Sequence, residues 1–125
     1  MINIVKDFQK DIARGWCYIP RTVTRSCNID LDKIDVLSMD QRRSVLQVIT
    51  PRVVQYLDST LTYIKALPIG ERSIRRFCII PFVIGYRTLV KIVEMGESKV
   101  SREEITSIMD EAAAFAKSNL SLIHI

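Results

Sequence analysis

The chain has 125 residues, of which 48% are hydrophobic and 26% are charged, and its formal net charge is +4. This length and balance suit one modest hydrophobic core, so we expect no more than one soluble globular domain. The positive charge is spread along the chain without a basic run or interleaved aromatic residues, which argues against nucleic-acid binding. It fits an anionic small substrate or an acidic membrane surface.

Cysteine usage and hydropathy indicate the compartment. Cys17, Cys27 and Cys78 form no C-x-x-C pair and have no histidine nearby in sequence, so neither a zinc site nor a disulfide framework is supported. We therefore expect a reducing, cytoplasmic environment, with peripheral membrane association as a further expectation. The longest uncharged run, residues 77–86, is about half of the ~20 residues that span a bilayer. Charged residues within positions 6–11 interrupt the apolar region that a signal peptide would need.

Residues 2–13 have the spacing of an amphipathic helix that ends at Gly15. In such a helix Asn3, Asp7 and Asp11 lie in one row at four-residue steps. An apolar row beside it contains Ile4, Val5, Phe8 and Ile12. Two carboxylates and an amide oxygen facing one point are the ligands that Mg²⁺ takes together with substrate phosphates.

The same residues allow a simpler interpretation. Lys6, Lys10 and Arg14 are interleaved with the acids at three- and four-residue spacing, which is also typical of a solvated helix face with ion pairs. D-x-x-x-D is a short pattern with many accidental matches. Spacing alone therefore leaves both a metal site and a surface ion-pair network open.

The middle of the chain predicts a loop followed by a long helix. Residues 16–37 lose helical periodicity and are rich in turn formers, with a short helical turn expected at residues 31–34. Ser38 and Gln41 have the spacing of a capping box and open a helix that runs to about Leu67. Pro51 removes one backbone hydrogen bond inside it, so we expect a kink or a split.

Two further helices are predicted. Residues 73–89 are apolar nearly all round, which predicts a helix buried on most faces. Pro81 and Gly85 within it fit a kink or a close approach that shapes a cavity wall, and the alternative is a core helix with a tolerated proline. Ser101 and Glu104 have capping-box spacing and open the last helix, which carries an apolar stripe.

Two stretches resemble the squalene/phytoene synthase family. N-I-V-K-D-F-Q-K-D at residues 3–11 is similar to the second aspartate-rich motif of the family, which has a glycine and an aromatic residue before a proline further along. The positions that match are Asn3, Asp7, Asp11, Gly15, Tyr18 and Pro20. Residues 77–89 are similar to the F-C-x-x-P-x-x-x-G/A-x-x-T-L pattern of the squalene synthase branch.

Two positions depart from the family pattern. Lys6 stands where arginine is usual, which keeps the charge but loses two-pronged hydrogen bonding. Trp16 stands where arginine is common, which removes a phosphate contact unless Arg14 substitutes.

The resemblance implies an all-α fold, with three to four long helices of the larger isoprenoid (terpenoid) synthase bundle. We expect residues 1–119 to be the C-terminal part of such a domain, truncated at its N-terminal side. Residues 120–125, L-S-L-I-H-I, look like one translated frame of a transposase adapter from sequencing libraries, so we expect an artefact there and give His124 no role. A natural apolar tail that docks on the bundle is the alternative.

The activity implied by the resemblance is Mg²⁺-dependent head-to-head (1′-1) condensation of two prenyl diphosphates, either farnesyl or geranylgeranyl diphosphate. The branch similarity favours conversion of farnesyl diphosphate to presqualene diphosphate and then, with NADPH, to squalene. A phytoene or dehydrosqualene synthase is the alternative, as is a catalytically dead member that serves as an assembly or scaffold protein. Because the first aspartate-rich motif is absent, we expect this fragment alone to be inactive.

The resemblance also implies roles for individual residues. Asp7 and Asp11 would be the catalytic metal ligands, with Asn3 as a neutral third ligand that also faces the substrate. Lys6, Lys99 and Arg102 would lie near the diphosphates, although Lys99 and Arg102 are equally interpreted as surface charges. The wall of the pocket for the isoprenoid tails would include Phe77, Cys78 and Pro81. Cys78 is expected to be a small apolar filler and not a nucleophile.

Overall fold

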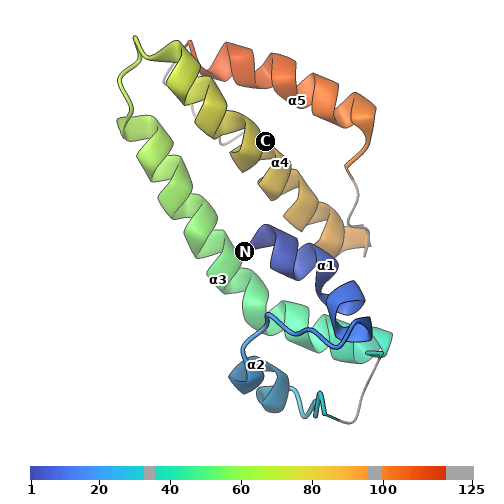
Figure 1. Ribbon diagram of the computed structural model, residues 1–125. Helices are drawn as coiled ribbons and strands as arrows, with labels where there is room; N and C mark the ends of the chain where they lie inside the picture. The colour runs from blue at the N-terminus through green and yellow to red at the C-terminus, as the bar shows by residue number, and fades with distance from the viewer. Residues whose placement is uncertain (33–35, 96–99, 118–125) are drawn as a thin grey trace. The chain divides into compact units, whose positions relative to one another are not determined.

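The computed structural model describes residues 1–32, 36–95 and 100–117, and these residues contain helices and no strands. The all-α class predicted from the sequence is confirmed. The helices, labelled in Figure 1, are α1 (Ile2–Ala13), α2 (Arg21–Ser26), α3 (Met39–Ala66), α4 (Arg72–Met95) and α5 (Arg102–Phe115). The chain forms two compact units, residues 1–54 and 55–125. In the described residues no helix is both long and apolar enough to cross a membrane.

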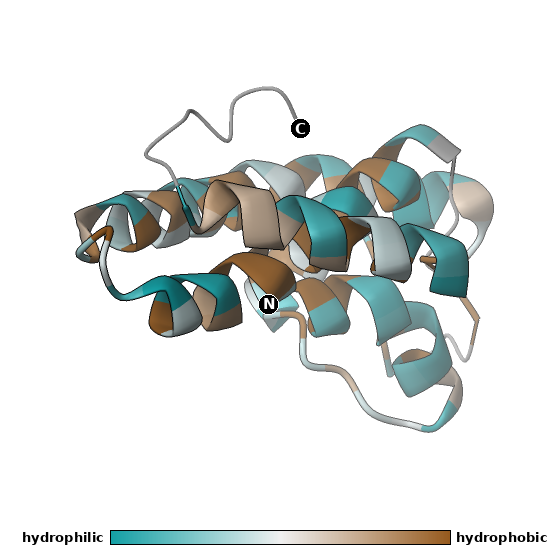
Figure 2. Cartoon of the chain, turned by 90° about the horizontal axis from the view of Figure 1, so that it is seen from above, coloured by the Kyte–Doolittle hydropathy of each residue, from teal (hydrophilic) through white to brown (hydrophobic). Residues whose placement is uncertain are grey.

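The first unit buries one face of α1. Val5, Phe8 and Ile12 are removed from water on that face, as their spacing predicts. The first turns of α3 bury Val45 and Ile49. The other buried hydrophobic residues of this unit are Ile19, Ile29, Leu37 and Val53. Figure 2 shows the same amphipathic pattern by colour, with hydrophobic residues on part of each helix and hydrophilic residues on the rest.

The expectation of irregular structure throughout residues 16–37 is wrong, because residues 21–26 form α2. Pro20 precedes the helix, and its carbonyl accepts hydrogen bonds from the amides of Val23 and Thr24. The Thr24 hydroxyl donates to the Arg21 carbonyl at 3.1 Å, and Thr24 is buried. Threonine and serine also favour turns, so their presence hid this short helix. The turn predicted at residues 31–34 lies partly outside the described residues.

The long helix α3 begins as predicted. The Ser38 amide donates to Oε1 of Gln41 at 2.9 Å, and the Gln41 amide donates to Oγ of Ser38 at 3.2 Å, which confirms the capping box. The alternative of a split at Pro51 is wrong, because α3 continues through it. Pro51 and Gln47 are both exposed, so the carbonyl left without its helical partner is accessible to water.

The second unit packs the C-terminal part of α3 and two antiparallel helices, α4 and α5, around one core (Figure 1). Each of the three helices contributes buried side chains to it. The core cluster consists of Ile64, Ile79, Phe82, Val83, Ile108, Ala112 and Ala116. Full burial of each isoleucine, valine or phenylalanine side chain stabilises the fold by about 1.5–3 kcal/mol.

A buried arginine closes the turn between α3 and α4. Arg75 is 2% exposed, and its Nη1 donates to the carbonyls of Ile64 at 3.2 Å and Leu67 at 2.7 Å. The last carbonyls of a helix have no partner within the helix. Arg75 therefore satisfies the end of α3 from the first turn of α4, and its charge complements the helix dipole.

Two ion pairs connect α4 to α5. Arg87 Nη2 lies 2.9 Å from Oε2 of Glu111, and Lys91 Nζ lies 2.7 Å from Oε2 of Glu104. Glu104 also accepts from the Ser101 amide at 2.7 Å, while Oγ of Ser101 accepts from the Glu104 amide. The second predicted capping box is thus confirmed. The hydrogen bonds from Lys91 and then from the Ser101 backbone lower the pKa of Glu104 from 4.5 to about 2.

This pKa predicts acid sensitivity of the second unit. A carboxyl group whose folded pKa is depressed stabilises the fold above its unfolded pKa and loses that contribution as the pH falls toward the folded value. The thermal midpoint should therefore fall between about pH 4.5 and about pH 2. Glu104→Gln should have a lower midpoint at pH 7 and a smaller decrease over this range, as followed by circular dichroism.

The matched control is Glu103→Gln, because Glu103 is exposed and lies beside Glu104 in the first turn of α5. The thermal midpoint of the Glu103→Gln variant should depend on pH as that of the wild type does. An unchanged profile in Glu104→Gln would contradict the assignment of this acid sensitivity to Glu104.

Candidate functional site

The predicted row of oxygen ligands lies along one side of α1 and lines one pocket. Asn3, Asp7 and Asp11 all contribute to an open cavity of about 570 Å³. The other lining residues are Ile4, Lys10, Arg14 and Tyr18. Because the buried face of α1 sets the rotation of the helix, the row is directed into this pocket and not into the core. The structure therefore brings the three sequence-predicted ligands together.

The two carboxylates of the row have different surroundings. Lys6 Nζ lies 3.4 Å from Oδ2 of Asp7, and both side chains are about one-third exposed. The Asp11 carboxylate has no hydrogen bond or ion pair with any side chain in the described part of the chain. An ion pair as exposed as that between Lys6 and Asp7 contributes about 0–1 kcal/mol to stability. It therefore does not prevent Asp7 from binding another cation.

The backbone at the end of α1 fixes Asp11, the last predicted ligand of the row. The carbonyl of Asp11 accepts from the Trp16 amide at 2.8 Å, and the carbonyl of Ile12 accepts from the Gly15 amide at 2.8 Å. Together with φ of +78° at Gly15, these two bonds make a Schellman motif. The predicted helix end at Gly15 is confirmed, and Asp11 sits in a rigid last turn.

The donor set fits a hard divalent cation. Mg²⁺ needs oxygen ligands and usually takes one or two carboxylates from the protein, while water and substrate phosphates complete its octahedron. Asp7, Asp11 and Asn3 supply three such oxygens in the same pocket. The described residues contain no group of three acidic, histidine or cysteine side chains placed to enclose a metal. The three residues by themselves therefore do not enclose a metal ion, and their role as metal ligands stays a prediction.

The cations of this pocket agree in part with those predicted, because Arg14, the possible substitute for the missing arginine at position 16, lines it. Lys6 contacts Asp7 and does not line the cavity, whereas Lys10 and Arg14 do. The sequence indicated that Lys10 and Arg14 lie near the acids, because each follows one of them by three residues and residues at this spacing are neighbours on a helix surface. The same spacing also fits ion pairs between these cations and the acids, so the sequence alone did not show that both cations line the pocket.

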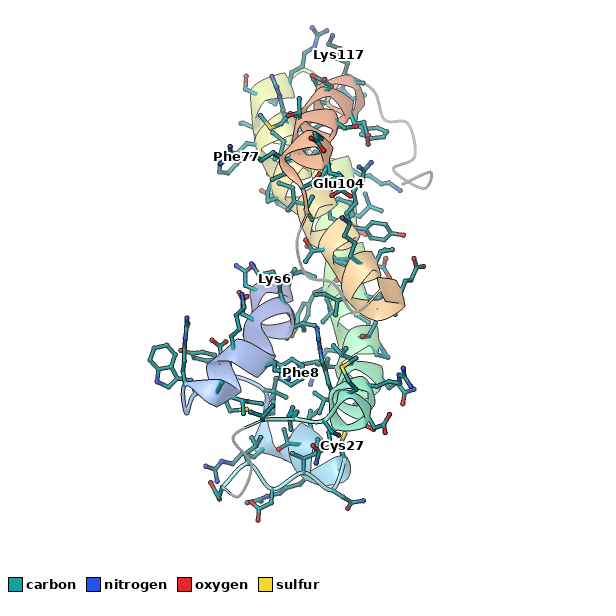
Figure 3. The ribbon with its side chains drawn as sticks, turned by 90° about the vertical axis from the view of Figure 1, so that its right-hand side faces the viewer. Lys6, Phe8, Cys27, Phe77, Glu104 and Lys117 are labelled. Carbon is teal, nitrogen blue, oxygen red and sulfur yellow. The ribbon has the colours of Figure 1, made fainter. Side chains whose placement is uncertain are left out.

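The predicted residues of the tail pocket lie on α4, in the second unit. The expectation that this helix is buried on most faces fails at its beginning, where Ile74 is exposed and Phe77 is 79% exposed, and holds over residues 78–89 apart from the exposed Pro81. Figure 3 shows Phe77 projecting away from α4. Ile79, Phe82 and Val83 of α4 lie in the core cluster, and Cys78 packs at its edge. Leu89 and Ile92 are buried further along the helix. The pocket-wall role of Phe77, Cys78 and Pro81 stays a prediction.

The remaining predicted positions are partly outside the description. Arg102 begins α5 and is exposed, which agrees with either a surface charge or an accessible phosphate ligand. Lys99 lies outside the described residues, as do the tail at 120–125 and His124 within it. The boundary at residue 119 falls in the same undescribed part.

The chain matches the model of a known protein family over most of its length. A family model described as squalene/phytoene synthase matches residues 1–108. This range includes α1 with its row of predicted ligands and the whole of α4. No curated protein and no solved structure matches the chain.

The geometry of Gly15 predicts that Gly15→Ala destabilises the fold. A Cβ at this position would meet nothing within 4 Å, so the cost comes only from the positive φ. We expect a loss of about 1 kcal/mol in the free energy of unfolding, measured by urea denaturation.

Gly70→Ala is the matched control, because its Cβ would also meet nothing within 4 Å and its φ lies outside the strained positive range. Its stability should stay close to that of the wild type. Equal effects of the two substitutions would contradict the role of the left-handed backbone at Gly15.

Proposed function

This chain belongs to the squalene/phytoene synthase family, and we propose that its parent enzyme condenses two molecules of farnesyl diphosphate to presqualene diphosphate and then squalene. The family is one of transferases of isoprenoid biosynthesis that join prenyl diphosphates head to head. The observation that carries the proposal is the convergence of Asn3, Asp7 and Asp11 on one open pocket.

The proposed role of the row is to hold Mg²⁺ against the diphosphate of the substrate. When bound, this ion supplies Lewis-acid stabilisation of the negative charge that develops on the leaving diphosphate. Asp7 and Asp11 present carboxylate oxygens and Asn3 presents a neutral one, all from one rigid helix. Such preorganised charges stabilise a transition state without rearranging during the reaction.

Basic residues complete the proposed electrostatics. Lys6 already lies beside Asp7 and adds positive charge at the edge of the row. Arg102 is exposed at the start of α5 and is proposed, together with Lys99, to contact diphosphate oxygens. Arginine suits this task because its planar group forms two parallel hydrogen bonds with phosphate.

The proposed tail-binding surface is the apolar strip of α4. Phe77 and Pro81 are exposed and Cys78 is half-buried beside them, so their apolar surface is available to an isoprenoid tail. Apolar contact of this kind would also keep water away from an allylic cation.

The product is the finer part of the proposal. The F-C-x-x-P pattern at residues 77–81 supports a squalene-type product with NADPH as reductant. Phytoene or dehydrosqualene, formed without reduction, is the alternative. Incubation of the parent enzyme with farnesyl or geranylgeranyl diphosphate, with and without NADPH, separates these products by chromatography.

A second candidate function follows from Trp16. This residue stands where the family commonly has arginine, and its neutral indole supplies no charge to a diphosphate. Its side chain is 55% exposed. A catalytically dead member that serves as a scaffold would tolerate this change. A degraded first aspartate-rich motif in the parent gene would favour the scaffold, and an intact one would favour the enzyme.

The metal row predicts the effect of removing one carboxylate. Asp7→Asn or Asp11→Asn in the parent enzyme should lower turnover of farnesyl diphosphate about a hundredfold or more, because each removes a charged ligand. Helical content, measured by circular dichroism, should not change. Asp58→Asn is the matched control, since Asp58 is an exposed acid on α3. Full activity in both row variants would remove the metal assignment.

The single acid row predicts that the 125-residue chain alone is inactive. Its sequence contains one D-x-x-x-D pattern, at residues 7–11, and we propose that residues 1–119 are the C-terminal part of a larger domain whose first motif supplies the opposite ligands. Release of pyrophosphate from farnesyl diphosphate should stay at background with Mg²⁺ present. Mg²⁺-dependent release above background would contradict this prediction.

A further inference from the structure

We infer that Lys10 and Arg14 form the diphosphate-binding cation pair of the α1 pocket. The inference rests on the proposed function and identifies which side chains of this chain contact the phosphate oxygens. Both residues line the same cavity as Asp7 and Asp11. Lys6, which the sequence pattern favoured for this role, does not line that cavity and lies against Asp7.

The positions of the two cations suit a ligand that is anionic and also binds a metal. Lys10 lies three residues after Asp7, and Arg14 lies three residues after Asp11, so the cations are surface neighbours of the acids on the helix. A metal ion held by the carboxylates and a phosphate held by the cations would then be adjacent. A diphosphate has oxygens enough to contact both at once.

The two side chains are also available. Within the described residues, neither the Lys10 ammonium nor the Arg14 guanidinium has a hydrogen-bond or ion-pair partner, and both residues are exposed. They are four residues apart, which places like charges side by side on the helix and is unfavourable without an anion between them. A bound phosphate would relieve this repulsion.

A purely structural role has a separate signature. Lys10 lies in the last turn of α1 and Arg14 is its C-terminal cap residue, and cations at this end of a helix favour the helix dipole. If this were their only role, their loss would lower stability and leave anion binding unchanged. Affinity for an anion therefore distinguishes the two roles.

The test is calorimetric titration of the chain with inorganic pyrophosphate in the presence of Mg²⁺, and with Mg²⁺ alone. Lys10→Gln and Arg14→Gln should each weaken pyrophosphate binding about tenfold, as expected for loss of one charge-assisted hydrogen bond. Arg14→Lys should recover part of the affinity, because it keeps the charge without the planar fork. Binding of Mg²⁺ alone should not weaken in any of these variants.

Lys65→Gln and Arg52→Gln are the matched controls, since both are exposed cations on α3. Circular dichroism verifies that each variant is folded. The inference is overturned if the Lys10 and Arg14 variants bind pyrophosphate like the controls, or if the wild-type chain does not bind pyrophosphate.

The outcomes also separate this inference from the proposed function. If Asp7→Asn abolishes Mg²⁺-dependent binding while Lys10→Gln and Arg14→Gln do not weaken it, the metal row stands and the cation pair fails. If binding depends on Lys10 and Arg14 but not on Mg²⁺ or Asp7, the cation pair stands and the metal row fails.

Discussion

Val5, Phe8 and Ile12 are removed from water on one side of α1, and their burial sets the rotation of that helix about its axis. Each such side chain contributes about 1.5–3 kcal/mol when buried, whereas an exposed ion pair such as that between Lys6 and Asp7 contributes about 0–1 kcal/mol. Packing therefore decides where the acids point. A shift of one residue would turn the helix by about 100° and remove the polar row from its pocket.

The two proposed parts of the site depend on different kinds of structure. The row of predicted ligands is held by a helix whose last turn is closed by backbone hydrogen bonds from Gly15 and Trp16. The apolar strip of α4 projects from a helix whose other side is fixed in the core of the second unit. Hydrophobic packing orients both helices, and the acid row depends in addition on the backbone hydrogen bonds that close the last turn of α1.

The features that the sequence predicted well are those with local causes. The ends of α1 and α3 and the capping box at Ser101 depend on a few neighbouring residues. The helix α2 was missed because six residues are too short for a periodic pattern. The exposed face of α4 was missed because an apolar sequence does not indicate which side other helices cover. Spacing located Lys10 and Arg14 near the acids, but the pocket that they share also includes Tyr18 from the following loop, whose place the spacing does not give. The roles of Asn3, Asp7 and Asp11 in binding metal stay predictions.

The buried Arg75 has a consequence for how the second unit loses its structure. A guanidinium group keeps its proton throughout the pH range in which proteins fold, so the link between α3 and α4 does not titrate. The link between α4 and α5 includes Glu104, whose pKa of about 2 makes it vulnerable to acid. Acid therefore weakens the polar link between α4 and α5 and does not affect the Arg75 link between α3 and α4. Ile108 and Ala112 of α5 also lie in the core of the second unit, and apolar contacts do not titrate, so acid removes a polar link between α4 and α5 and leaves their apolar packing in place.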